Sequence, residues 1–316
     1  MVFKMAKEVL IKVGYGNIAY KVWGDNSPSA QKFLGVHGWL DNAGSFDPLM
    51  PYFQNQGRCV ACLDLPGHGL SSHHPQGIPY SHASDIQAMR SVIKDLGWQN
   101  YHLLGHSMGA MRSQMYALCW ASEVISVLNL DAVIMPIEHI SPGKTPFEAL
   151  GKQVDKYLGY RDTYHGKARE HTWDELAQRW LAAVPDLGLD NFTVLMERGS
   201  TKLANGMYVF NRDPALHNRT NAVLGHSTKE IFSCMQKLGH IPQIVLSSSN
   251  FGSFTKDCPE LADTVDKFLH ALSEIYPNKM EIINVGGSHH FHMHTPKETS
   301  DILNKFLAHV PHNDSS

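Results

Sequence analysis

The sequence predicts an α/β fold with a mostly parallel, eight-stranded sheet, helices on both faces and a helical insertion. Short apolar segments alternate with longer amphipathic segments over the first 136 residues and again from residue 239 onward. This alternation is typical of parallel strands joined by helices. The intervening residues 137–238 have a mainly helical pattern. We therefore predict a core of residues 1–136 and 239–316 with a cap of residues 137–238 inserted into it.

Each element has its own local signal. The first two strands flank a Gly-rich turn, which predicts an antiparallel hairpin, and the later strands are short and apolar. The predicted strands are residues 9–13, 18–22, 33–36, 60–63, 101–104, 124–130, 241–246 and 280–285. The predicted helices are residues 46–54, 84–96, 110–120, 147–158, 173–184, 259–276 and 296–310.

The composition favours a globular, enzyme-like protein. Of 316 residues, 43% are hydrophobic and 18% are charged, which suits a sizeable core. A net charge of −3 and a pI near 6.7 argue against an electrostatic nucleic-acid binder. No apolar run reaches the length of a transmembrane segment, and the first residues lack the apolar centre of a signal peptide. The sequence leaves the oligomeric state open.

The five cysteines form an odd set, which suits a reducing compartment. Cys59 and Cys62 make a C-x-x-C pattern, but they lie in an apolar segment where a free cysteine is a small core residue. We therefore expect a cytoplasmic protein and no redox motif.

The pentapeptide of residues 105–109 has the form G-x-S-x-G and lies between a predicted strand and a predicted helix. Gly105 and Gly109 allow the two elements to cross closely, and a strained backbone at Ser107 would aim its hydroxyl away from the sheet. The alternative is a Gly-flanked helix start with serine as an ordinary N-terminal residue. The context favours Ser107 as a nucleophile.

A serine needs a base, and the last predicted strand is followed directly by a histidine-rich segment. Its members are His289, His290, His292 and His294. One neutral imidazole at this end of the sheet could reach Ser107. Alternating histidines can also bind zinc, but the segment holds no acidic or cysteine partner, so no metal is expected. The remaining histidines are expected to be packing or solvated residues.

Two further turns follow predicted strands. After residues 33–36 come His37, Gly38 and Trp39, where a backbone N–H could face a developing oxyanion together with the N–H of Met108. An ordinary strand-end turn is the alternative. Asp64 begins the turn after the next strand and is expected to organise that turn.

The order of these motifs resembles the α/β-hydrolase fold family. Residues 36–47 and 208–216 are more specific and resemble the animal serine hydrolase-like (kraken-type) proteins. The resemblance covers roughly residues 9–310. It implies an α/β-hydrolase fold with an inserted cap and a catalytic histidine seven residues before the proline that opens the last helix. Counting back from Pro296 gives His289, with His290 as the runner-up.

The resemblance also concerns the acid that supports the histidine. In most members this acid follows the strand after the cap, and the matching position here is Asn250, a departure from the pattern. An amide orients a histidine but does not carry the charge that stabilises imidazolium. Some members take the acid from the preceding strand, which implies Asp131. A capping role is the alternative for Asp131, and Asp257 is another candidate acid.

These expectations combine into a serine hydrolase that cleaves an ester, thioester or related acyl bond of a small molecule through an acyl-enzyme on Ser107. It would need no metal or organic cofactor. An epoxide hydrolase or dehalogenase of this fold would be expected to have an aspartate at position 107. The candidate substrate-binding residues, which suggest an apolar acyl group, are His37, Trp39 and Met111.

A second hypothesis retains the fold without efficient catalysis. The departure at Asn250 motivates a catalytically weak or inactive protein that binds a small molecule or partner under its cap. The presence of both Ser107 and His289 argues against it.

Overall fold

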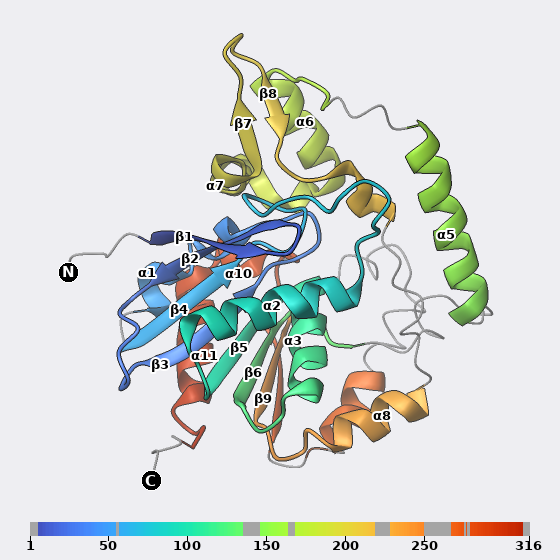
Figure 1. The fold of residues 1–316 in the computed structure, drawn as a ribbon. Helices are drawn as coiled ribbons and strands as arrows, with labels where there is room; N and C mark the ends of the chain where they lie inside the picture. Colours follow the sequence, from blue (N-terminus) through green and yellow to red (C-terminus); the bar gives the residue numbers. More distant parts are fainter. Residues whose placement is uncertain are drawn as a thin grey trace.

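A mostly parallel sheet forms the centre of the computed structural model, which describes residues 6–54, 57–134, 146–163, 168–218, 228–249, 267–274, 276 and 279–311. The strand order is β1-β2-β4-β3-β5-β6-β9-β10 (Figure 1). Only the pairs β1–β2 and β2–β4 are antiparallel. The strands are β1 (Lys7–Val13), β2 (Gly16–Trp23), β3 (Gln31–Val36), β4 (Arg58–Leu63), β5 (Tyr101–His106), β6 (Val124–Leu130), β9 (Gln243–Ser247) and β10 (Met280–Asn284). The predicted eight-stranded α/β sheet is confirmed.

The inner strands are covered on both faces. On one face, residues of β3, β4 and β5 pack with α2 (His82–Leu96) and α3 (Met108–Cys119). On the other face, the alternate residues of the same strands pack with α1 (Met50–Phe53) and α11 (Pro296–Leu307). Because the inner residues of these strands meet no water on either face, their sequence is mainly apolar instead of alternating.

The C-x-x-C pattern is divided between the two faces. Cys59 belongs to the apolar cluster under α2 and α3, whereas Cys62 belongs to the cluster under α1 and α11. Both thiols are free and buried. Burial raises the pKa of the Cys59 thiol to about 11, so it stays protonated at neutral pH. The structure supports the interpretation of both cysteines as core residues.

The helix expected at residues 46–54 is interrupted. A 3₁₀ turn, η1 (Ala43–Phe46), precedes the short α1. Pro48 and Pro51 lack the N–H that a continuous helix would need to bond residues 44 and 47, so the ladder is broken at both positions. By contrast α2 is long and well capped, from a capping box at Ser81 to a left-handed Gly97 with a φ of 68°.

The segment between β6 and β9 lies largely outside the sheet layers (Figure 1). It contains α5 (Pro146–Thr163), α6 (Trp173–Ala183), η2 (Pro185–Leu187), α7 (Gly188–Gly199), η3 (Pro214–Asn218) and α8 (Thr228–Gln236). A small hairpin of β7 (Ser200–Lys202) and β8 (Tyr208–Phe210) interrupts the mainly helical pattern. Helices α6 and α7 share an apolar cluster of their own, whereas α8 packs into the cluster of the sheet. The cap boundaries 137 and 238 stay a prediction.

A buried charge cluster joins α7 to the sheet. The Nε atom of Arg198 donates to Oδ2 of Asp64 at 2.8 Å, and its Nη1 atom donates to Oε1 of Glu8 at 2.7 Å. Asp64 is fully buried and also accepts the N–H groups of Ala43 and Leu70. Asp64 therefore organises the turn after β4, as the sequence predicted, and anchors α7 above it.

Replacing Arg198 with methionine should lower the free energy of unfolding by about 3–5 kcal/mol, because Asp64 would stay buried without its cation. Glu8→Gln is the matched control: Glu8 is half-exposed, so its loss should cost about 1 kcal/mol or less. Denaturant titrations of both variants measure the difference. Equal effects from the two changes would contradict the prediction.

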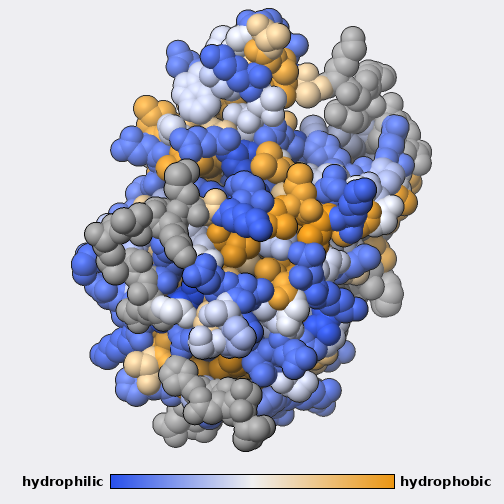
Figure 2. Space-filling view, turned by 60° about the vertical axis from the view of Figure 1, so that its left-hand side comes forward, coloured by the Kyte–Doolittle hydropathy of each residue, from blue (hydrophilic) through white to orange (hydrophobic). Residues whose placement is uncertain are grey.

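Apolar side chains occur both in the helices and on the surface of the described part of the chain. None of the helices there is both long and apolar enough to cross a bilayer. On the face drawn in Figure 2, apolar side chains form patches that polar side chains interrupt.

Candidate functional site

The turn between β5 and α3 holds Ser107 in a strained conformation. Its φ of 52° and ψ of −120° lie outside the regions that non-glycine residues favour. Added side chains at the flanking glycines would collide with backbone: a Cβ at Gly109 would overlap the carbonyl oxygen of Val36, and one at Gly105 would overlap Ala110. Such strain costs about 1–3 kcal/mol and persists where the surroundings enforce it. Ser107 is partly exposed at the carboxyl end of the sheet.

His289 and Asp131 lie in direct contact. The Nδ1 atom of His289 is 2.6 Å from Oδ2 of Asp131, and the carboxylate is fully buried. A carboxylate only accepts hydrogen bonds, so Nδ1 carries the proton and Nε2 is left as the basic nitrogen. Asp131 also accepts the N–H of Ser248 at 2.6 Å and its hydroxyl at 2.8 Å. These donors compensate for burial of the charge.

The pairing of β5 with β6 brings Ser107 close to Asp131. Strands β5 and β6 are neighbours, and His106 pairs with Leu130, so Ser107 and Asp131 directly follow paired residues. The N–H of Ser107 donates to the carbonyl of Leu130 at 2.8 Å. From the other side, Nε2 of His106 bonds the carbonyl of His289 at 3.0 Å. Ser107 and Asp131 therefore follow the ends of neighbouring strands, whereas His289 comes from the loop after β10, two strands away from β6.

The two residues expected to supply oxyanion donors, Trp39 and Met108, have different surroundings. Met108 is the first residue of α3, where the helix leaves its first N–H groups without intrahelical partners and its dipole favours negative charge. Trp39 follows β3, and its indole ring, 48% exposed, meets the His217 ring edge-on at 5.3 Å. Trp39 therefore lies between the sheet and η3 of the inserted segment.

The expected substrate-binding residues differ in accessibility. His37 is fully buried, its Nδ1 donates to the carbonyl of Gly38 at 2.7 Å, and its Nε2 accepts the N–H of Leu65 at 3.0 Å. This ring ties the turn after β3 to the turn after β4 and presents no free nitrogen to a substrate. Met111 is partly buried and packs against the cluster under α2 and α3. Of the three, the Trp39 side chain is the most exposed.

The buried His37 should make stability depend on pH. Burial lowers the pKa of the His37 imidazole in the folded state, so below about pH 6.5 the unfolded chain takes up a proton that the folded chain refuses. Well above pH 6.5 the imidazole is neutral in both states, so His37 then has no effect on the pH dependence of stability. As pH falls, the free energy of unfolding should decline by up to about 1.4 kcal/mol per pH unit for this group. Denaturant titrations of His37→Asn between pH 7 and 5 should give a smaller change in the free energy of unfolding per pH unit, corresponding to at most one fewer proton taken up on unfolding. The same pH dependence in the variant and the wild type would contradict this.

The other histidines of the rich segment have different surroundings. His290 is buried beside Asp41, with Nε2 of His290 3.3 Å from Oδ2 of Asp41. His292 is fully buried, its Nε2 lies 2.8 Å from the hydroxyl of Ser45, and burial holds its pKa well below the ordinary range. His294 is exposed and contacts Asn191. Only His289 of the four contacts Asp131 among the described side-chain bonds.

The sequence reasoning missed three polar residues of the site. Ser248 supports Asp131, whereas Asp41 and His106 form a buried cluster with His290. The serine run of residues 247–249 and the variable position of G-x-S-x-G are weak signals, because neither carries a periodicity or a chemical pattern of its own. The other two candidate acids, Asn250 and Asp257, lie outside the described residues.

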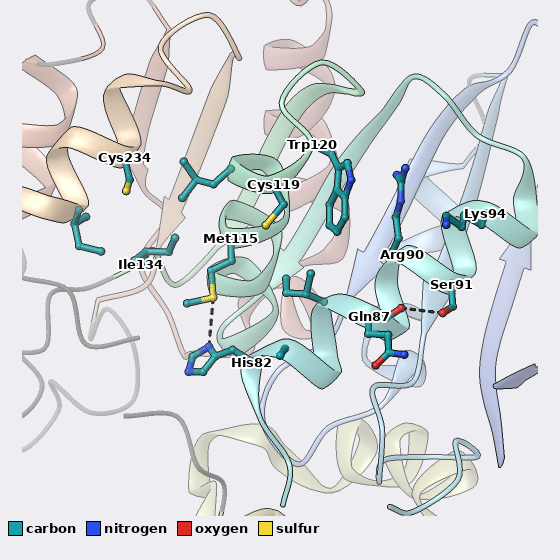
Figure 3. A pocket seen from close by; sticks show the side chains of 14 residues that line it. His82, Gln87, Arg90, Ser91, Lys94, Met115, Cys119, Trp120, Ile134 and Cys234 are labelled. Atoms are coloured by element: carbon teal, nitrogen blue, oxygen red, sulfur yellow. Dashed lines mark hydrogen bonds between the residues drawn. The ribbon is translucent and has the colours of Figure 1, made fainter. Parts of the chain in front are cut away.

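A separate pocket of about 760 Å³ lies between α2, α3 and α8 (Figure 3). Its walls are mainly apolar, with Met115, Trp120 and Ile134 among them and Arg90 at its border. Neither Ser107 nor His289 lines it. This pocket is therefore distinct from the site at the strand ends.

Comparison with known proteins places this geometry in a family. A family model for the α/β-hydrolase fold matches residues 33–186. A probable serine hydrolase from Drosophila melanogaster is 32% identical over 309 residues, which cover 95% of this chain and 87% of that protein. Serine hydrolase-like protein 2 from Homo sapiens is 29% identical over 320 residues, covering 96% and 94%.

Solved structures agree on the fold. A hypothetical protein from Pseudomonas aeruginosa superposes with a TM-score of 0.74 at 23% identity, covering 95% of this chain and 99% of that one. The thioesterase domain from the curacin biosynthetic pathway gives a TM-score of 0.74 at 20% identity, covering 95% and 100%. The chain belongs to the α/β-hydrolase fold family and, within it, to the serine hydrolase-like proteins.

Proposed function

We propose that this hydrolase cleaves an ester, thioester or related acyl bond through an acyl-enzyme on Ser107, with His289 as base and Asp131 as the orienting acid. The observation that carries the proposal is the 2.6 Å contact between Nδ1 of His289 and the buried carboxylate of Asp131. Because this contact fixes the proton on Nδ1, the opposite nitrogen is free to take the proton of a serine hydroxyl.

The reaction has two halves. In the first, Nε2 of His289 accepts the hydroxyl proton as Oγ of Ser107 bonds to the substrate carbonyl carbon, and the carbonyl electron pair moves to oxygen. The backbone N–H groups of Trp39 and Met108 hold that oxyanion. When the intermediate collapses, the leaving group takes the proton from His289. In the second half, water gives a proton to His289 and attacks the acyl carbon; as this intermediate collapses, His289 returns the proton to Oγ of Ser107 and the acid is released.

Asp131 acts through His289. Its charge stabilises the imidazolium that forms in each half-reaction, and its position selects the productive tautomer. Ser248 holds the carboxylate with two hydrogen bonds. Asp131 would thereby take the role of the acid that most members have after the strand that follows the cap. This arrangement supplies what Asn250 lacks and weakens the main argument for an inactive protein.

We propose an apolar acyl group as the substrate moiety that enters the site, because Trp39 and Met111 are the candidate walls. We further propose that residues 137–238 act as the cap above it and that the protein works in the cytoplasm; the described cysteines are all free. p-Nitrophenyl esters of increasing acyl length test the first point. A kcat/KM that fails to rise from acetyl to octanoyl would contradict an apolar acyl site.

The hydrolase proposal is tested by covalent labelling with a fluorophosphonate, which reports an activated serine without knowledge of the substrate. The wild-type protein should be labelled at one residue, identified as Ser107 by peptide mass spectrometry. Ser107→Ala should lose the label, and Ser273→Ala, an exposed serine on a helix, should keep it. Absence of labelling in folded wild-type protein would favour the non-catalytic binding protein instead.

A further inference from the structure

A cluster of three buried polar side chains lies behind the proposed catalytic residues. We call Asp41, His106 and His290 the Asp41 cluster. Oδ2 of Asp41 is 3.4 Å from Nδ1 of His106 and 3.3 Å from Nε2 of His290, and the three atoms lie within 4.8 Å of one another. All three side chains are at least nine-tenths buried. The described contacts of the proposed hydrolase reaction do not account for this arrangement.

Hydrogen bonding leaves Nδ1 of His106 without a proton. The Nε2 atom of this ring is 3.0 Å from the carbonyl oxygen of His289, which only accepts, so Nε2 carries the hydrogen. In the neutral ring Nδ1 is then a bare acceptor. It has no hydrogen-bond partner and faces the Asp41 carboxylate. Two electron-rich atoms that face each other in a dry interior repel, and a cation between them would remove the repulsion.

The distances fit a metal better than hydrogen bonds. Charge-assisted N–H···O⁻ bonds are about 2.7–2.9 Å long, shorter than both contacts of Asp41. In a tetrahedral site with metal–ligand bonds of about 2.0–2.1 Å, neighbouring ligand atoms lie about 3.3–3.4 Å apart. Two of the three ligand–ligand distances, 3.4 Å and 3.3 Å, have this length.

Gly38 packs closely against the cluster. A Cβ added there would lie 2.9 Å from Nδ1 of His106 and 3.0 Å from Oδ2 of Asp41, closer than ordinary van der Waals contact. The two atoms therefore point to the same side of the cluster, where a side chain at position 38 would crowd both of them.

We propose that the Asp41 cluster binds one divalent transition metal ion of the Zn²⁺ class. Two imidazole nitrogens and one carboxylate oxygen are a donor set that suits Zn²⁺, whereas Mg²⁺ and Ca²⁺ prefer oxygen ligands alone. Coordination through Nε2 of His290 would require its single ring proton to be carried on Nδ1 instead, with no net change in the protons on the ring. The histidine-rich segment holds no carboxylate, which is why the sequence predicted no metal; Asp41 lies 249 positions from His290.

The site would connect the end of β5 with two loops. His106 directly precedes Ser107, His290 directly follows His289, and Asp41 is two positions after Trp39. A shared ion would fix these loops relative to one another and stabilise the folded state, because the separated ligands of the unfolded chain bind it far more weakly. This role is independent of the hydrolase reaction, and no proton transfer passes through the metal.

The test is metal binding by the full chain. After treatment with a chelator, the wild-type protein is titrated with ZnCl₂ under equilibrium dialysis and with CoCl₂ under absorption spectroscopy. We expect one equivalent of zinc, a d–d absorption typical of four-coordinate cobalt, and a higher Tm with zinc. Asp41→Asn and His290→Gln should each lower the affinity at least about tenfold. Gly38→Ala, which keeps all three ligands but crowds Nδ1 of His106 and Oδ2 of Asp41, should lower it as well.

Two neighbouring histidines give matched controls. His292→Gln removes a buried histidine of the same segment that is outside the cluster and should keep the zinc equivalent. His289→Gln tests whether zinc binds at the catalytic histidine instead. Circular dichroism checks the fold of each variant, and the wild-type titration decides if a ligand variant does not fold. The proposal is overturned by wild-type protein that takes up no zinc, by unchanged affinity in folded ligand variants, or by loss of binding in His289→Gln alone.

Discussion

Ser107→Ala should lower kcat by about 10⁶-fold, the loss typical of removing the nucleophile from a serine–histidine–aspartate site. The alanine methyl group cannot form the acyl-enzyme, so only binding and oxyanion stabilisation would remain. Alanine also loses no hydrogen bond that supports the fold, because the backbone N–H of residue 107 still donates to Leu130. Initial rates with an activated ester, taken at enzyme concentrations that expose a small residual rate, measure the effect.

The double variant Ser107→Ala/His289→Ala gives the sharper check. Residues that act in one step are strongly non-additive, so the double variant should be no slower than Ser107→Ala alone. An additive loss would show that His289 contributes to a reaction that does not pass through Ser107. A residual kcat in Ser107→Ala of more than a few per cent of wild type would contradict the assignment of the nucleophile.

Asp131→Asn should lower kcat by about 10⁴-fold while KM changes little. The amide can keep accepting from Ser248 through its oxygen, but its NH₂ group would then face Nδ1 of His289. The ring would respond by accepting at Nδ1 and carrying its proton on Nε2, the nitrogen that must be bare to activate Ser107. The loss therefore comes from both the wrong tautomer and the missing charge. Steady-state kinetics and a slowed rate of fluorophosphonate labelling report it.

Asp257→Asn is the matched control for the acid, because the sequence offered Asp257 as an alternative. This variant should keep kcat within about twofold of wild type, a free-energy change below 1 kcal/mol. A larger loss in Asp257→Asn than in Asp131→Asn would move the acid to the loop after β9.

Local pattern was sufficient to predict the sheet and to single out Ser107 as the candidate nucleophile. Both signals lie within a few consecutive residues. Burial on two faces makes a whole strand apolar, and the close crossing of a strand and a helix requires glycine on both sides of Ser107. The helix expected at residues 46–54 is shortened to α1 for a local reason as well, since Pro48 and Pro51 each lack the N–H that a continuous helix would need. Resemblance to a family then supplied His289 and Asp131, which no local pattern singled out.

Contacts between distant residues could not be predicted. Asp41 meets His290 across 249 positions, and Arg198 meets Asp64 across 134. Such pairs depend on how loops pack at the end of the sheet. No fixed separation in the sequence connects the two residues, so no sequence pattern predicts the contact. His37 illustrates the same limit: its place in the turn after β3 was predicted, but its two hydrogen bonds to backbone, which commit the ring to the fold, follow only from the tertiary arrangement.

Among the described residues, three that are not glycine have a positive φ: Leu40, Ser107 and Asp131. All three follow strands at the carboxyl edge of the sheet. A chain selected for thermodynamic stability alone would replace them with glycine, since each unfavourable conformation costs free energy that glycine would recover. These three conformations lower the stability of the folded state, and in exchange they set the directions in which the side chains at this edge point. Variants with glycine at these positions should therefore have a higher Tm and a lower activity.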